Sequence, residues 1–141
     1  MMLNEILPIK YPIIMAPMFL VTNVKMMLAA MDSGIAGCIP ALNFRTLAEF
    51  EKALVILQKT GKCYGVNLIV NKSNYKLHDQ LNLCLQYKVP FIITSLGSPE
   101  KVITACRPAG MKVFCDVSEM AFAHKAARFE PDALIAVLDN A

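Results

Sequence analysis

The sequence predicts an α/β fold of one domain, residues 1–141, in which about six parallel strands alternate with helices. The first observation is a series of apolar runs, each typical of a buried strand, with a helix-patterned stretch between each pair. The second is the composition, because 56% hydrophobic and 18% charged residues are typical of strands that helices cover on both faces. The third is the length, which suffices for one core that buries about two-thirds of the unfolded surface. The six runs are residues 11–18, 34–40, 64–70, 90–95, 111–117 and 132–138.

The first run ends in an apolar corner, Ala16, Pro17 and Met18, where a hairpin would have a polar turn. This ending indicates a parallel strand that brings its backbone to a site at its C-terminal end. Thr22 is the expected N-cap of the helix that follows, and Gly34 is the expected stop. The apolar positions of this helix follow the i, i+3, i+4, i+7 rule at Val24, Met27, Leu28 and Met31.

The second run is rich in small residues, which favours the close approach of a helix or of a flat ligand. Thr46 and Glu49 then have the spacing of a capping box, which stabilises a helix by about 1 kcal/mol. Gly61 is expected to end that helix. Its inward-facing positions are predicted to be Leu47, Phe50, Leu54 and Leu57.

Asn67 is an amide within the otherwise apolar third run. Burying it without a partner would cost about 1–3 kcal/mol, so it needs a hydrogen-bond partner. Two kinds of partner are possible: a neighbouring backbone group, or the polar edge of a bound ligand. The next helix has its apolar positions at Leu77, Leu81, Cys84 and Leu85. His78 is expected on the surface of that helix, away from the strand ends where barrel chemistry gathers.

The fourth run ends in Thr94 and Ser95, whose hydroxyls would lie with the Gly97 backbone at one rim, to meet a ligand or to complete the turn. Ser98 is the expected cap of the next helix and Pro99 its first-turn residue.

Asp116 closes the fifth run as a carboxylate at a strand end, either as a turn former or as part of a site. Ser118 is expected to cap a last helix that extends to about Phe129. That helix would pack through Met120, Ala123, Ala127 and Phe129, with His124 in solvent.

Several functional classes receive no support from the sequence. The net charge of +3 comes from scattered residues, unlike the basic patches that bind nucleic acid. The longest apolar run is residues 13–21, too short to span a membrane, and no targeting segment is visible. The five cysteines form no C-x-x-C pair, so we expect buried thiols and no metal site. Together these features predict a cytoplasmic protein.

The spacing of the strands fits a partial TIM barrel, a (β/α)₈ fold of eight strands and about 250 residues. Two strands of that barrel would be missing, and the first and last strands would have unpaired edges. The alternative is an open doubly wound sheet, which can be complete at this length. Its dinucleotide signature, G-x-G-x-x-G after the first strand, is absent.

Five strings of the sequence resemble, in order and spacing, the nitronate monooxygenase (2-nitropropane dioxygenase) family. The strings are Tyr11-Pro12-Ile13-Ile14-Met15-Ala16-Pro17-Met18, Gly34-Ile35-Ala36-Gly37, Gly65-Val66-Asn67-Leu68, Val89-Pro90-Phe91-Ile92-Ile93-Thr94 and Asp132-Ala133-Leu134-Ile135-Ala136. The resemblance implies an FMN-binding TIM barrel, a flavoprotein oxidoreductase that oxidises alkyl nitronates with O₂. Related flavin-dependent enoyl-acyl-carrier-protein reductases share these motifs, so an enoyl thioester is the alternative substrate.

On this resemblance, Ala16, Pro17 and Met18 line the flavin ring, Asn67 hydrogen-bonds its polar edge, and Asp116 borders the same pocket. A flat apolar contact and one orienting amide suit a cofactor that carries out the redox chemistry itself.

The resemblance also implies that the catalytic histidine of the family lies in a Gly-Gly-His segment after the position of residue 141. Glycine-rich turns that hold the FMN phosphate come later still in the family. Neither His78 nor His124 matches that histidine, so no catalytic residue is assigned. We therefore expect the 141-residue chain, as a fragment, to bind FMN weakly or not at all. A third hypothesis is a non-catalytic half-barrel that associates with itself through its open sheet edges.

Overall fold

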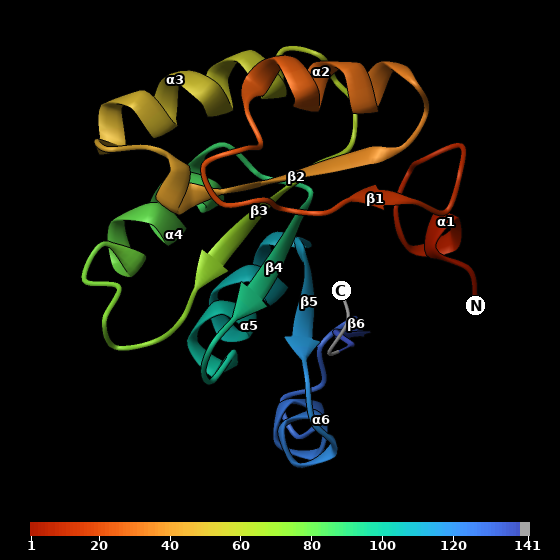
Figure 1. Cartoon of the computed structure of the whole chain (residues 1–141), viewed down its shortest axis with the longest axis vertical. Helices are drawn as coiled ribbons and strands as arrows, with labels where there is room; N and C mark the ends of the chain where they lie inside the picture. The colour runs from red at the N-terminus through yellow and green to blue at the C-terminus, as the bar shows by residue number, and fades with distance from the viewer. Residues whose placement is uncertain (139–141) are drawn as a thin grey trace.

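The computed structural model describes residues 1–138 and shows one sheet of six parallel strands that pair in the order β1-β2-β3-β4-β5-β6. Because strands and pairs follow the chain order without a switch point, the sheet is part of a TIM barrel and not a doubly wound sheet. Figure 1 shows the helices from α2 to α6 following one another around the outside of the curled sheet. The strands are β1 (Ile14–Met15), β2 (Ala36–Pro40), β3 (Tyr64–Ile69), β4 (Phe91–Ser95), β5 (Lys112–Val117) and β6 (Ala133–Ala136).

All six predicted strands are confirmed, each shorter than its apolar run. The α-helices are α1 (Leu3–Ile6), α2 (Val24–Asp32), α3 (Leu47–Gln58), α4 (Leu77–Gln86), α5 (Glu100–Cys106) and α6 (Met120–Ala127). Two short 3₁₀ helices, η1 (Ala41–Asn43) and η2 (Arg107–Ala109), follow β2 and α5. Pro108 lies within η2, directly after the end of α5 at Cys106.

Two apolar clusters lie on the two faces of the sheet, and residues of β1, β2, β4 and β5 alternate between them. The outer cluster lies between the sheet and the helices, where Met27, Phe50, Leu54 and Leu57 pack on outward-facing strand residues such as Val66. The concave cluster is smaller and is built from Ala36, Cys38, Cys63, Phe91, Ile93 and Phe114, with Leu7 from the N-terminal segment. Helices α2 to α6 therefore cover one face of the sheet, and the N-terminal segment packs on the other, so the cover of helices on both faces that the composition predicted is wrong.

Two strand glycines allow side chains to approach closely. A Cβ at Gly37 would lie 2.7 Å from the Met27 sulfur of α2, so the close helix expected beside β2 is present. A Cβ at Gly65 would lie 2.2 Å from the Phe91 ring, which stacks on Phe114 at a centroid distance of 5.5 Å. Strand β3 thus makes room for an aromatic pair on the concave face.

The predicted helix ends hold at some positions and fail at others. The capping box is confirmed, because the Thr46 hydroxyl accepts from the Glu49 N–H while the Glu49 carboxylate accepts from the Thr46 N–H. The Thr22 cap is wrong: Asn23 Oδ1 accepts from the Met26 N–H and is the N-cap of α2. The Thr22 hydroxyl instead accepts a hydrogen bond from the backbone of the preceding turn.

The caps predicted for the two later helices are also wrong in position. Helix α5 begins at Glu100, whose N–H reaches the Ser98 hydroxyl at 3.4 Å, and Pro99 precedes its first turn. Helix α6 begins at Met120, and Ser118 is exposed. The packing predicted for α6 is confirmed for Phe129, which packs on the outer cluster, and Ala123 is half-buried. It is wrong for Met120 and Ala127, which are exposed, and Ala126 is the buried residue of this helix.

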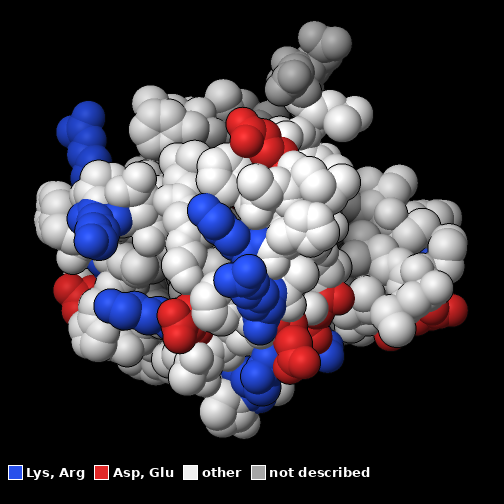
Figure 2. Space-filling model, turned by 90° about the horizontal axis from the view of Figure 1, so that it is seen from below, with Lys and Arg blue, Asp and Glu red and all other residues white. Residues whose placement is uncertain are grey.

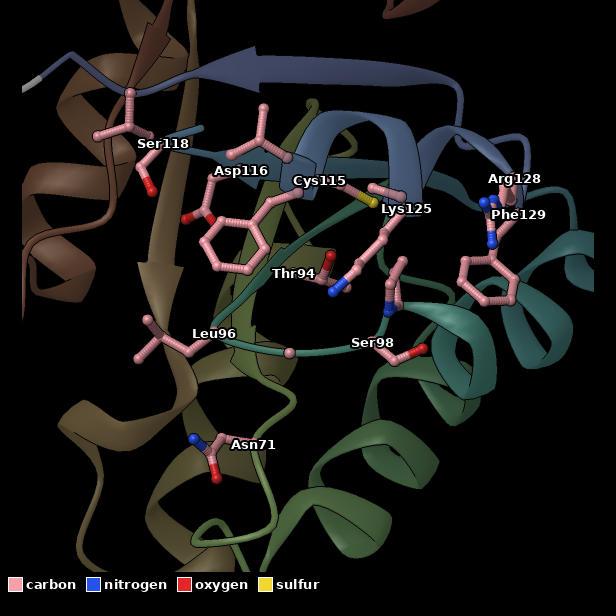
Figure 3. Close-up of a pocket in the computed structure, with 16 residues that line it drawn as sticks. Asn71, Thr94, Leu96, Ser98, Cys115, Asp116, Ser118, Lys125, Arg128 and Phe129 are labelled. Atoms are coloured by element: carbon pink, nitrogen blue, oxygen red, sulfur yellow. The ribbon is translucent and has the colours of Figure 1, made fainter. Parts of the chain in front are cut away.

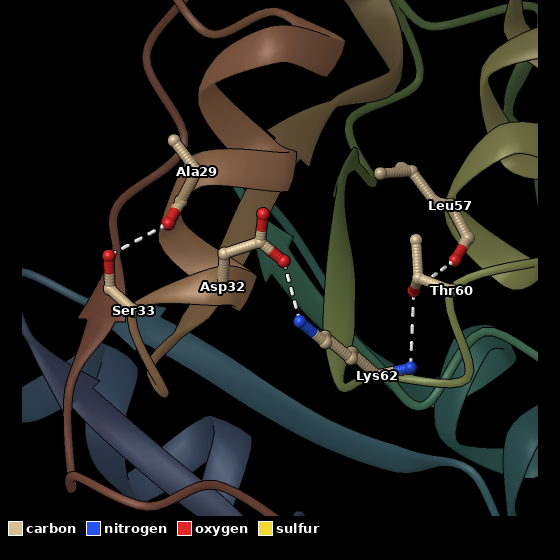
Figure 4. Close-up of polar contacts among 6 residues, drawn as sticks. All are labelled: Ala29, Asp32, Ser33, Leu57, Thr60 and Lys62. Atoms are coloured by element: carbon tan, nitrogen blue, oxygen red, sulfur yellow. Dashed lines mark hydrogen bonds and ion pairs between the residues drawn. The ribbon is translucent and has the colours of Figure 1, made fainter.

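Polar contacts at the N-terminal ends of the strands join neighbouring helix ends (Figure 4). The Lys62 ammonium, after α3, forms an ion pair of 2.5 Å with Asp32 at the end of α2. Thr60 connects the same turn to α3, because its hydroxyl donates to the Leu57 carbonyl and accepts from the Lys62 N–H. Both charged side chains of the ion pair are exposed, so it contributes little to stability.

Charges of both signs share the face seen in Figure 2, where blue and red side chains lie among each other and no single sign dominates. All five cysteines are buried, as predicted. Across residues 1–138, no helix has the length and apolar character needed to cross a bilayer, and no three His, Cys, Asp or Glu side chains cluster as a metal site would require.

Strands β1 and β6 are the edges of the sheet, and each pairs on one side in the described part of the chain. Strand β1 has two residues, and large apolar side chains beside both edges are exposed, such as Ile13 and Leu134. The unpaired edges expected from the strand count are therefore seen.

Candidate functional site

Three polar side chains meet on the concave face at the C-terminal ends of adjacent strands: Asn67 of β3, Ser95 of β4 and Asp116 of β5. Asn67 Nδ2 donates to the Ser95 hydroxyl at 2.8 Å, and that hydroxyl in turn donates to Asp116 Oδ2. We call these three residues the rim network. The parallel register produces it, because Asn67 pairs with Ile93 and places Ser95, two residues further along β4, on the same face.

The partner of Asn67 is therefore a neighbouring strand, which was one of the two possibilities left open. Besides Ser95, its Nδ2 donates to the Ile93 carbonyl at 3.0 Å, and the side chain is 7% exposed. Within residues 1–138, no group donates a hydrogen bond to its Oδ1. The amide is thus held on its nitrogen side, and its oxygen remains an acceptor for a further group.

Asp116 is half-buried, and this burial raises the pKa of its carboxyl above the usual range, against the opposing effect of the Ser95 hydrogen bond. The neighbouring Cys115 has its thiol pKa raised chiefly by burial; a hydrogen bond from Thr94 lowers it, and the Asp116 charge raises it. The carboxyl is therefore easier to protonate than an exposed one.

The segment that follows β1 lies at the same end of the sheet and consists of Ala16, Pro17 and Met18. Ala16 is exposed, and Met18 is 36% exposed. The Met18 N–H donates to the Thr22 hydroxyl at 2.9 Å, and its carbonyl accepts from Asn43 Nδ2 at 3.2 Å. After Met18 the turn exposes three more apolar side chains in succession, Phe19, Leu20 and Val21. No hydrogen bond joins this segment to the rim network in the described part of the chain.

Asn43 is a positioning residue that the sequence analysis missed. Its amide also accepts from the Leu20 N–H at 2.8 Å and donates to the Thr22 carbonyl at 2.9 Å, so it ties the turn after β1 to η1. A polar residue shortly after a buried strand was the available signal.

A cavity of about 830 Å³ lies beside the rim, between α6, the turn at residues 96–99 and the ends of β4 and β5 (Figure 3). Of the five residues predicted for a flavin site, Asp116 lines this cavity, whereas Ala16, Pro17, Met18 and Asn67 do not. Thr94 and Gly97, both expected at the rim, line it too. The structure thus brings Asn67 and Asp116 together through Ser95, and it places a separate cavity on the other side of Asp116.

Comparison with solved structures shows the same fold in longer proteins. FabK from Thermotoga maritima superposes with a TM-score of 0.85 at 30% sequence identity, over 95% of this chain and 42% of FabK. A nitroalkane oxidase from Streptomyces ansochromogenes gives 0.80 at 22% identity, over 95% of this chain and 47% of its own. A mandelate oxidase variant with a monooxide FMN adduct gives 0.61 at 14% identity, over 90% and 48% of the two chains. No protein-family model and no curated protein matched the sequence.

The chain spans less than half the length of each of these three proteins. The matches extend over 90–95% of its own length. The chain therefore has the fold of part of a (β/α)₈ barrel, and the proteins that share this fold include one solved with FMN.

Proposed function

We propose that the chain is part of an FMN-dependent oxidoreductase and that its concave rim contacts the flavin ring. The observation that carries the proposal is the similarity to FabK over 95% of the chain at 30% identity. The resemblance of five sequence strings to flavin enzymes, spread from residue 11 to residue 136, supports it independently.

The residues present fit the ring of a flavin. Ala16, Pro17 and Met18 offer an exposed apolar surface at the end of β1, suited to a flat aromatic face. Asn67 offers a fixed amide whose Oδ1 can accept from the ring N3–H, while Ser95 and Asp116 hold the nitrogen side of that amide. When bound, the flavin supplies the redox chemistry, and these residues bind and orient it.

Flavin binding to the 141-residue chain tests this proposal. Because the contacts proposed for Ala16, Pro17, Met18 and Asn67 are with the ring and not with the phosphate, we expect weak binding with similar Kd values for FMN and riboflavin. Fluorescence quenching of each flavin would measure it. Asn67→Ala should weaken binding by about tenfold, the loss of one buried hydrogen bond, whereas the exposed Asn82→Ala serves as the control.

A second variant covers the case that Asn67→Ala fails to fold. Ala16→Glu places a charged side chain at an exposed position, so folding should be unaffected while ring contact is blocked. If both variants bind flavin as well as the unmodified chain does, the rim is not the flavin site.

The substrate we propose is an alkyl nitronate, oxidised with O₂. The second candidate, reduction of an enoyl thioester, is favoured by the higher sequence identity to FabK than to the nitroalkane oxidase. With the gene product isolated from its source, nitronate-dependent O₂ consumption supports the first reaction. Oxidation of NAD(P)H that depends on a crotonyl thioester supports the second.

The third hypothesis, a non-catalytic half-barrel in the cytoplasm that pairs through its edges, rests on the exposed apolar residues beside β1 and β6. Size-exclusion chromatography separates it from the others. A monomer with cooperative unfolding would argue against association through these edges.

A further inference from the structure

We propose that the cavity beneath α6 is a second binding site, and that it takes a small anionic amphiphile, an alkyl chain with a carboxylate head group. This proposal does not depend on flavin binding. The cavity has a volume of about 830 Å³, which falls in the range of about 300–1,000 Å³ typical of sites for small molecules.

The walls of the cavity are mainly apolar and come from separate parts of the chain. Leu96 belongs to the turn after β4, Phe122 to α6 and Val137 to the segment after β6. These three side chains border the cavity and are 68%, 49% and 41% exposed. A ligand in the cavity would therefore cover apolar surface that is otherwise in contact with water. An alkyl chain is the ligand chemistry that matches such walls.

The charges at the cavity favour an anion. Lys125 extends from α6 into the cavity toward the part of β4 that carries Thr94, and Arg128 directly follows this helix, beside Phe129 (Figure 3). Neither cation forms an ion pair with another residue in the range 1–138. The Lys125 ammonium lies 5.9 Å from the centroid of the Phe122 ring, which keeps it at the apolar wall.

Two further groups define where the head group would lie. Thr94 is 3% exposed and lines the cavity. Because its hydroxyl can accept from the protonated Cys115 thiol, it is able to donate its own proton to a carboxylate that Lys125 holds. All residues that line the cavity are described by the structure, and Asp116 is the one acidic residue among them. It lies at the rim, where the Ser95 hydroxyl donates a hydrogen bond to its carboxylate. Repulsion from Asp116 would direct an anionic head group toward Lys125.

The test is a ¹⁵N NMR titration of the 141-residue chain with dodecanoate, dodecanol and dodecyltrimethylammonium, each below its micelle concentration. We expect saturable shifts from dodecanoate at the amides of residues 96–98, 117 and 122–128. Dodecanol should bind more weakly, and the cationic probe should bind least. Equal affinity for the three probes, or shifts spread over the exposed strand edges, would overturn the proposal.

Lys125→Met removes the charge and keeps most of the stem, and it should raise the Kd for dodecanoate by about two- to fivefold, as for an ion pair that stays partly hydrated. The Kd for dodecanol should not change. Lys101→Met, at an exposed position on α5 outside the cavity, is the matched control and should leave both affinities unchanged.

Photocrosslinking with a diazirine-bearing dodecanoate gives a second readout that does not rely on assigned spectra. Labelled peptides should map to the turn after β4 and to α6. If no dodecanoate binds, the proposal is wrong.

Discussion

Replacing Gly65 with Ala tests the account of the concave core most directly. Its Cβ would lie 2.2 Å from one atom of the Phe91 ring and 2.4 Å from the next. The ring cannot move freely, because Phe91 is 0% exposed and stacks on Phe114, which is 1% exposed. Overpacking of this kind costs about 1–3 kcal/mol. The lower entropy of the unfolded Ala chain offsets about 0.4–1 kcal/mol of it.

With the middle of each range, the net loss of stability should be about 1.3 kcal/mol. With an m value of about 2 kcal/mol/M, the urea midpoint would fall by about 0.5–1 M, as measured by far-UV circular dichroism. Gly37→Ala is the matched control, because its Cβ would meet the flexible end of Met27, the sulfur at 2.7 Å, which can move aside. We expect that control to change stability by less than about 0.5 kcal/mol.

Phe91→Leu supplies the decisive comparison, since a smaller side chain makes room for the new methyl group. In a double-mutant cycle the two changes should couple by at least about 0.5 kcal/mol, with the pair less harmful than the sum of the singles. Strict additivity, or a midpoint for Gly65→Ala equal to that of the unmodified chain, would refute the steric reasoning.

Three other substitutions or modifications follow from the structure. Because burial raises the folded pKa of Asp116, its contribution to stability is full below the unfolded pKa and is lost as the pH rises through the folded value. Asp116→Asn should therefore raise the urea midpoint at pH 7 more than at pH 4; an equal shift at both would contradict this. Tyr64→Phe should raise stability by about 1 kcal/mol, since the buried hydroxyl has no hydrogen-bond partner within residues 1–138; a loss on thermal unfolding would indicate a hidden partner. Burial raises the pKa of Cys63 and of Cys106 to about 11, so the thiols should react with a disulfide reagent at pH 8 only as fast as the protein opens, and immediate reaction would show exposed thiols.

The strands could be predicted from local patterns, because each apolar run is one continuous stretch of the sequence. Asn67 and Asp116 could likewise be selected as polar residues at strand ends, the positions where barrel sites form. Their connection through Ser95 could not be predicted, since it depends on the register of β3, β4 and β5. The same register determines whether the Asn67 side chain forms a hydrogen bond with a neighbouring strand.

Helix starts were the least predictable feature, because several polar residues compete for each cap. Thr22 and Asn23 are adjacent and both can cap, and which one does depends on the turn that Asn43 holds from η1. Ser98 and Ser118 fail for a similar reason, since the chain runs on for one or more residues before the helix begins.

The sequence by itself determined the alternating strands and helices, the buried cysteines and the choice of Asn67 and Asp116 as polar residues among apolar ones. Only the tertiary structure decided between a half-barrel and an open sheet, because both have the same β/α pattern and differ in which strands pair. It also determined that Lys125 and Phe122 border a cavity, since the packing of α6 on the sheet depends on contacts between segments distant in sequence.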